Sequence, residues 1–238
     1  MSSMQTMSAT AALARMRLAG FVRTGRALVP LLTLLVVLAT MYGGGQAQAG
    51  EAYGFSAAVL FPVVAWQTQI LLNVEPDVQR QLSTVAAGRL GREIAAGLLA
   101  AGMAALGVVF LALVVPWLIG GIAVPEPGDP SLLSGVVAGV WAHLLLLPPA
   151  LLLGALASRA AVGNVARGMA VLAGGSVLAF VLGTTDSPVR WLAPPLLPTA
   201  RATVAGLDAA QLALQTALAL AWAAAGLLGY LALRRRNG

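Results

Sequence analysis

The chain has 238 residues, of which 59% are apolar and only 9% are charged, whereas soluble domains carry roughly 25% charged residues. A soluble fold of this length cannot hide so much apolar surface, so the composition indicates a membrane protein. Cysteine and lysine are both absent, which excludes disulfides, thiolate metal ligands and the P-loop lysine of a Walker A ATPase site.

Residues 1–26 form a basic segment that precedes the first apolar stretch, and we expect it on the cytoplasmic side. One interpretation is a helix lying in the membrane surface, in which Leu13, Met16 and Leu18 contact lipid while arginines favour anionic headgroups. The alternative is a flexible basic tail that only sets the orientation of the chain.

Six apolar segments follow, and a transmembrane helix needs about 20 such residues. We predict a six-helix transmembrane domain over residues 27–233 and a cytoplasmic tail over residues 234–238. The predicted spans are residues 27–44, 52–72, 94–119, 132–157, 169–185 and 209–233. The fifth is the shortest and lies at the lower length limit for a span.

The arginines are distributed unequally between the two sides that these spans define. Twelve of the fourteen precede the first span, follow the last, or lie in the second-to-third and fourth-to-fifth connections. Only Arg190 and Arg201 lie on the other side. The positive-inside rule therefore predicts that both termini are cytoplasmic. Membrane orientation therefore accounts for the net charge of +6, and nucleic-acid binding is not needed to explain it. The predicted fold class is an all-α polytopic membrane protein.

The segment before the last span, residues 186–208, is too apolar for a plain aqueous loop. Pro194, Pro195 and Pro198 prevent a long helix there. A short re-entrant element and an interfacial loop anchored by Trp191 are both consistent with these residues.

Residues for catalysis are scarce. His143 is the only histidine, no GxSxG sequence occurs, and every acidic residue lies in a loop or at a helix end. The sequence therefore predicts neither a metal site nor an enzyme. His143 lies inside a span, where it either lines a substrate path or bonds to a neighbouring helix as a neutral imidazole. Gly135 and Gly139 form a GxxxG pair in the same span.

The connection between the second and third spans is polar. Gln67, Gln69 and Asn73 lie near the end of the second span, and Gln69 and Asn73 share a helix face. Residues 75–77, Glu-Pro-Asp, then resemble a helix start, with proline and acids in the first turn. A short cytoplasmic helix over residues 79–87 is expected. It is either a docking surface for a soluble partner or a solvated connector.

This layout resembles the permease subunits of ATP-binding-cassette (ABC) exporters, specifically the type 2 exporter group. The sequence LLNVEPDVQRQLSTVAAGR resembles the region of their coupling helix, and WLAPPLLPTARA resembles their re-entrant helices. The resemblance implies that the ATPase contacts Glu75, Pro76, Asp77, Gln79, Arg80 and Ser83. It places the substrate pathway or permease interface at Gln67, Gln69, Asn73 and His143.

The resemblance also implies partners. ATP and magnesium would bind a separate ATPase subunit, so this chain would need no cofactor of its own. A second permease, identical or homologous, would complete the transmembrane unit in the cytoplasmic membrane of a bacterium. The expected substrate is amphipathic or hydrophobic, such as a drug, an antibiotic or a lipid. The rival interpretations are an ATP-independent transporter and a membrane scaffold.

Overall fold

The computed structural model describes residues 3–184, 187–205 and 208–236, apart from the side chains of residues 3–8, 77 and 86. Helices make up the regular structure of this part of the chain, and no β-strand occurs in it. In chain order the elements are α1 (Ser3–Arg23), α2 (Leu28–Tyr42), α3 (Ala49–Leu72), α4 (Asp77–Ala87), α5 (Leu90–Leu118), α6 (Leu132–Leu156), α7 (Arg159–Val162), α8 (Val165–Leu182), the 3₁₀ turn η1 (Arg190–Leu192), α9 (Leu196–Ala205) and α10 (Ala209–Arg236).

Five of these helices are long and apolar enough to cross a membrane: α3, α5, α6, α8 and α10. The first predicted span, residues 27–44, is the 15-residue helix α2. It meets the length criterion only together with the end of α1, from which it is bent by 71°. The chain is therefore an all-α polytopic membrane protein with five or six spanning helices.

Two predicted boundaries differ from the structure. The fifth span begins at Val165, earlier than residue 169, because the Asn164 side chain accepts a hydrogen bond from the Arg167 backbone N–H and caps α8. The last helix continues to Arg236, so most of the predicted tail is helical. Arg234 is buried there against an acidic partner, which extends the helix beyond its apolar part.

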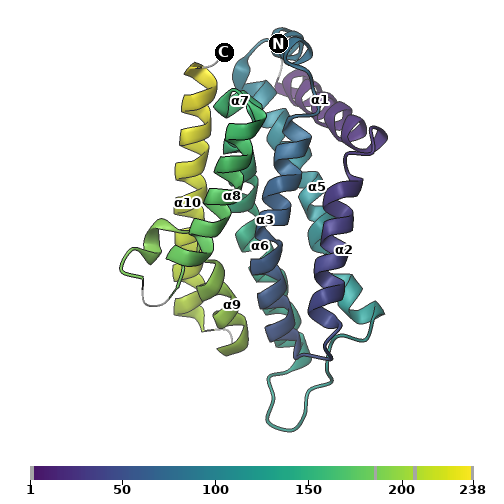
Figure 1. Ribbon diagram of the computed structural model, residues 1–238, viewed down its shortest axis with the longest axis vertical. Coiled ribbons are helices and arrows are strands. Elements are labelled where there is room, and N and C mark those ends of the chain that lie inside the picture. Colours follow the sequence, from purple (N-terminus) through teal and green to yellow (C-terminus); the bar gives the residue numbers. More distant parts are fainter. Residues whose placement is uncertain (1–2, 185–186, 206–207, 237–238) are drawn as a thin grey trace.

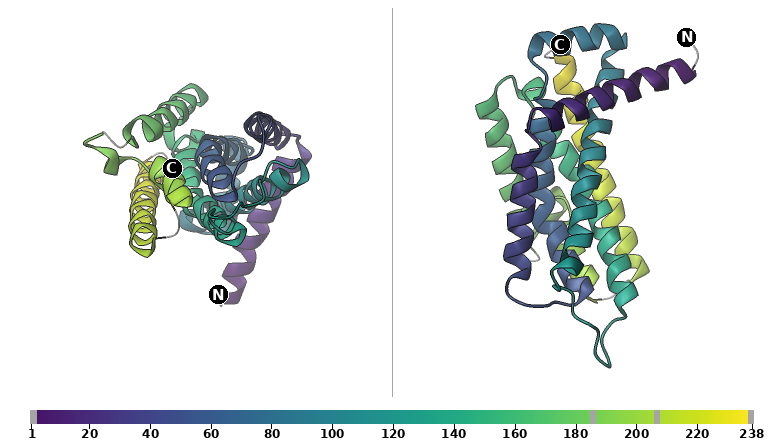
Figure 2. Two further views of the ribbon diagram at one scale, coloured as in Figure 1. Left: turned by 90° about the horizontal axis from the view of Figure 1, so that it is seen from below. Right: turned by 90° about the vertical axis from the view of Figure 1, so that its right-hand side faces the viewer.

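Both described ends of the chain lie at the same end of the bundle (Figure 1). We call this the arginine-rich end, because Arg17, Arg26, Arg159 and Arg234 make their contacts there. At this end α1 leaves the bundle at a steep angle and α4 lies across the helix ends (Figure 2, right). This is the end at which the positive-inside rule predicts the cytoplasm.

Helix α3 is the centre of the bundle. It packs most extensively on α6 and also contacts α2, α5, α8 and α9. Its position explains why residues are buried along most of its length, including Ser56, Gln67 and Gln69, whereas α8 and α10 bury only a few residues each. The predicted broken element is present as η1 and α9, and α9 packs on α3 and α6 at the end opposite the arginine-rich end.

Glycines on α6 allow α3 to approach closely. A Cβ atom at Gly139 would lie 2.6 Å from the ring of Tyr53, and one at Gly154 would lie 2.6 Å from the Cβ of Thr68. At Gly135 a Cβ would lie 2.8 Å from the backbone nitrogen of Gly50. The GxxxG pair of residues 135 and 139 is therefore part of a helix interface within the chain.

Replacement of Gly139 by leucine should destabilise the bundle by about 1–3 kcal/mol or more, because the added side chain has no room against Tyr53. The measurement is the apparent melting temperature of the purified chain in detergent. Gly107→Leu on α5 is the control, since a Cβ there meets nothing within 4 Å. Equal melting temperatures for the two variants would contradict the close α3–α6 contact.

Candidate functional site

Four charged side chains meet at the arginine-rich end. Arg17 of α1 donates hydrogen bonds to Glu75 Oε2 at 2.9 Å and to Glu93 Oε1 of α5. Its second amino group donates to the backbone carbonyl of Glu93 at 3.0 Å. Arg234 of α10 donates to the other oxygen of Glu93 at 2.7 Å. Glu93 thus lies between two guanidinium groups, and we call these four residues the ion network.

The ion network is buried, and Glu93 is only 1% exposed. Arg17, Glu75 and Arg234 are buried as well. Tyr230 accepts a hydrogen bond from Arg234 at 3.2 Å, and the guanidinium lies 5.9 Å from its ring centre. Two positive and two negative charges therefore neutralise each other where water cannot solvate them.

Further hydrogen bonds attach the turn between α3 and α4 to its neighbours. The Arg159 backbone N–H donates to Asn73 Oδ1 at 2.9 Å, and its side chain donates to the Glu75 carbonyl at 3.2 Å. Arg26 donates to the carbonyls of Asn73 and Val74. As a result, the turn is attached to α1 through Arg17, to the connection between α1 and α2 through Arg26, and to α7 through Arg159.

The predicted ATPase contacts occupy different environments. Glu75 and Ser83 are buried, and Glu75 is paired with Arg17 instead of facing solvent. Pro76 and Gln79 are exposed, and Arg80 is half-buried. Asp77 begins α4, but its side chain lies outside the described residues. Docking at these positions stays a prediction. The buried side chains of Glu75 and Ser83 do not face a partner, whereas those of Pro76 and Gln79 do face solvent.

An apolar stripe lies on the exposed face of α4. Val78, Leu82 and Val85 are 70%, 65% and 78% exposed. Their i, i+4, i+7 spacing places them on one face of the helix. The residues predicted from the sequence in this segment are mainly polar and do not include the stripe, although its i, i+4, i+7 spacing is visible in the sequence. Exposed apolar residues grouped on one helix face are typical of a protein-binding surface.

The predicted pathway residues are not brought together in one cavity. Gln69 donates to the Ala157 carbonyl at 2.9 Å, and Asn73 accepts from Arg159. Gln67 is buried beside a cavity of about 210 Å³ that α1, α2 and α5 also line. These three residues connect or fill spaces between helices, so a transport pathway through them stays a prediction.

His143 is buried between α6 and α3. Its Nδ1 lies 2.8 Å from the Gly139 carbonyl, and its Nε2 lies 3.2 Å from the Ser56 hydroxyl of α3. A carbonyl only accepts, so Nδ1 carries the proton and Nε2 is left to accept. This arrangement matches the interpretation of His143 as a hydrogen-bonding residue between helices.

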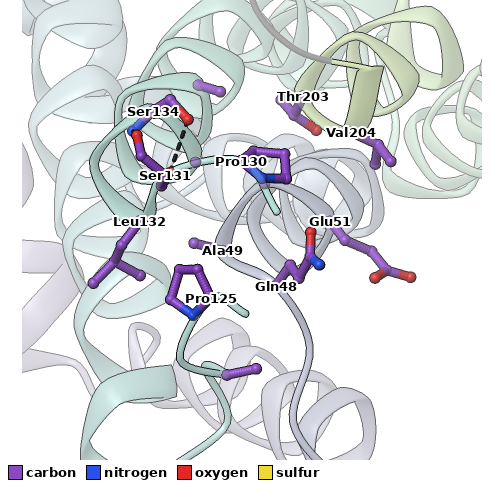
Figure 3. Close-up of a pocket in the computed structure, with 14 residues that line it drawn as sticks. Gln48, Ala49, Glu51, Pro125, Pro130, Ser131, Leu132, Ser134, Thr203 and Val204 are labelled. Carbon is purple, nitrogen blue, oxygen red and sulfur yellow. Dashed lines mark hydrogen bonds between the residues drawn. The ribbon is translucent and has the colours of Figure 1, made fainter. Parts of the chain in front are cut away.

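Two cavities lie at the end opposite the arginine-rich end. The first, between the starts of α3 and α6 and the end of α9, is lined by Gln48, Ser131 and Thr203 (Figure 3). Its volume of about 30 Å³ fits water only. The second is a cleft of about 600 Å³ between α2, α3 and α9. Its walls are mostly apolar, with Glu51 and Arg201 as charged residues.

Removal of the charge on Glu93 should disrupt the ion network. Glu93→Gln and Arg234→Gln should each destabilise the protein by about 3–5 kcal/mol, because each leaves a buried charge without its partner. The double variant should lose less than the sum of the two single losses, since both single variants already lose the same ion pair between Glu93 and Arg234. The stability of the two single variants and of the double variant is measured by unfolding in increasing concentrations of sodium dodecyl sulfate.

Glu126→Gln is the control for this cycle, because Glu126 is an exposed acid in the loop between α5 and α6, at the opposite end of the bundle. Its stability should equal that of the parent. Additive losses for Glu93 and Arg234 would contradict the direct pairing of the two side chains.

No family model matches the sequence, and neither a curated protein nor a solved structure matches the chain. Among the described residues, no group of three or more histidine, aspartate or glutamate side chains is placed to hold a metal ion. The geometry by itself shows a multi-pass membrane protein with a buried ion network and an exposed apolar helix face at one end.

Proposed function

We propose that this chain is the membrane-spanning permease subunit of an ABC exporter, and that a separate ATPase docks on α4 and powers it. The observation that carries the proposal is the apolar stripe of Val78, Leu82 and Val85 on α4. A helix that shows three aliphatic side chains to the cytoplasm needs a partner to cover them, and a groove on a soluble protein is the usual partner.

The connections of α4 are suited to transmitting force. The helix follows α3 through the turn at residues 73–76, and Gly88, with φ of 72°, ends it directly before α5. The ion network joins Glu75 in the turn to Arg17 of α1, and through it to Glu93 of α5. A partner that moves α4 would therefore move the ends of α1, α3 and α5 together.

The absence of lysine supports a division of labour between two chains. Without a P-loop lysine this chain has no standard ATPase site of its own. In the proposal, ATP and magnesium bind the partner ATPase, and a second permease, identical or homologous, completes the transmembrane unit. The membrane is the cytoplasmic membrane of a bacterium.

The cleft between α2, α3 and α9 supports an amphipathic substrate. Its walls are formed by apolar residues that include Met41, Phe55 and Leu197, and Glu51 and Arg201 are its charged residues. A molecule with a long apolar part and a polar group can contact both the apolar walls and the charged residues. Many drugs, antibiotics and lipids have this structure. Sugars and small ions would leave the apolar walls without a partner.

Charges placed in the apolar stripe should prevent docking. Leu82→Asp combined with Val85→Asp should abolish co-purification of a P-loop ATPase from native membranes, because desolvating two carboxylates in an apolar contact is costly. The matched control, Leu82→Met with Val85→Ile, keeps the stripe apolar and should keep the ATPase bound. Both variants should fold, since both side chains are exposed.

Two results would count against the proposal. Retention of the ATPase by the aspartate variant would show that α4 is not its docking surface. Purification of the parent chain without any ATPase, across several mild detergents, would favour an ATP-independent transporter or a membrane scaffold.

A further inference from the structure

A groove lies between α8 and α10 at the arginine-rich end. Its volume is about 600 Å³, and Ala161 and Val162 of α7 line it together with Gly163, which follows α7. Helix α7 contacts both α8 and α10, whereas these two helices make little direct contact with each other. The end of α10 lies beside α7 and the start of α8 in Figure 1. The groove therefore separates two membrane-spanning helices at the level where they leave the membrane.

Two arginines line the groove. Arg167 belongs to the first turn of α8 and Arg236 to the last turn of α10, and both are exposed. Neither takes part in an ion pair within the described part of the chain, whereas Arg17 and Arg234 do. The groove therefore has two positive charges that no acidic side chain is seen to neutralise.

The remaining lining of the groove is apolar. Ala170, Val171 and Leu233 line it together with the residues of α7. Below it, α8 and α10 expose apolar side chains such as Val177, Val181 and Leu228, which a bilayer would cover. A ligand at this level thus meets guanidinium groups at one end and hydrocarbon at the other.

We propose that this groove is a binding site for the headgroup of an anionic phospholipid. Arg167 and Arg236 contact the phosphate, and the glycerol and first acyl carbons lie along Ala170, Val171 and Leu233. Charge complementarity supports this occupant, because basic pockets between transmembrane helices on the cytoplasmic side suit anionic headgroups. Guanidinium groups also form paired hydrogen bonds with phosphate oxygens. The site does not depend on the proposed ATPase or on transport.

The test measures lipid binding to the purified full-length chain in detergent by native mass spectrometry. The probes are phosphatidylglycerol and phosphatidylcholine with identical acyl chains, and glycerol phosphate as the headgroup alone. Phosphatidylglycerol should bind more tightly than phosphatidylcholine, and glycerol phosphate should not displace it at the same concentration. The double variant Arg167→Gln, Arg236→Gln should weaken phosphatidylglycerol binding by about fivefold for each arginine removed.

Two variants make the result specific. Arg89→Gln with Arg235→Gln removes the same charge from exposed arginines that do not line the groove, and it should leave the binding of phosphatidylglycerol unchanged. Ala170→Phe fills the groove without changing the charge and should weaken binding. Because Ala170 is exposed, this variant should fold.

Four results would overturn the proposal. Equal losses in the two double variants would indicate general attraction between lipid and basic surface. Equal binding of the two lipids would show that the anionic headgroup is not recognised. Displacement by glycerol phosphate at equal concentration would indicate a site for a soluble anion. A change from dimer to monomer in the Ala170→Phe variant would indicate that a second copy of the chain covers the groove.

Discussion

The arrangement of the arginine-rich end depends on Glu93, which lies between Arg17 and Arg234. Each of the three residues would be costly to bury alone, because the desolvation free energy of an unpaired charge is larger than the free energy gained by packing it. Together with Glu75 they form a neutral group, and that group can be buried only when α1, α5, α10 and the turn after α3 meet. The ion network therefore specifies how these separate segments are placed relative to one another.

The position of α4 follows from that constraint. Glu75 faces the ion network, so the polar turn that leads into α4 is held against the bundle. The helix begins at Asp77 and lies across the end of the bundle (Figure 2, right). Val78, Leu82 and Val85 are on its exposed face. The proposed ATPase contact relies on both features: the attachment of the turn to the bundle and the apolar surface of α4.

The opposite end is organised by backbone proximity instead of charge. Glycines on α6 and α3 let these helices and α9 approach closely, and neutral side chains such as Ser56 and His143 bond across the contact. In a bilayer this kind of packing replaces the hydrophobic effect, because lipid is as apolar as the side chains. The two ends thus differ in the interactions that hold their helices together. One end has an ion network, and the other has close packing of small residues beside an amphipathic cleft.

The sequence by itself determined the fold class, five spans close to their observed bounds, the short polar helix α4 and the broken element before α10. These features follow from local hydropathy, proline and glycine positions, and the distribution of arginine. Tertiary structure alone decided that Glu75 faces inward to Arg17, that Arg234 belongs to a buried network and that α2 falls short of a full span. Pairing between residues such as Arg17 and Glu93, 76 positions apart, leaves no local pattern, because it depends on which helices pack together.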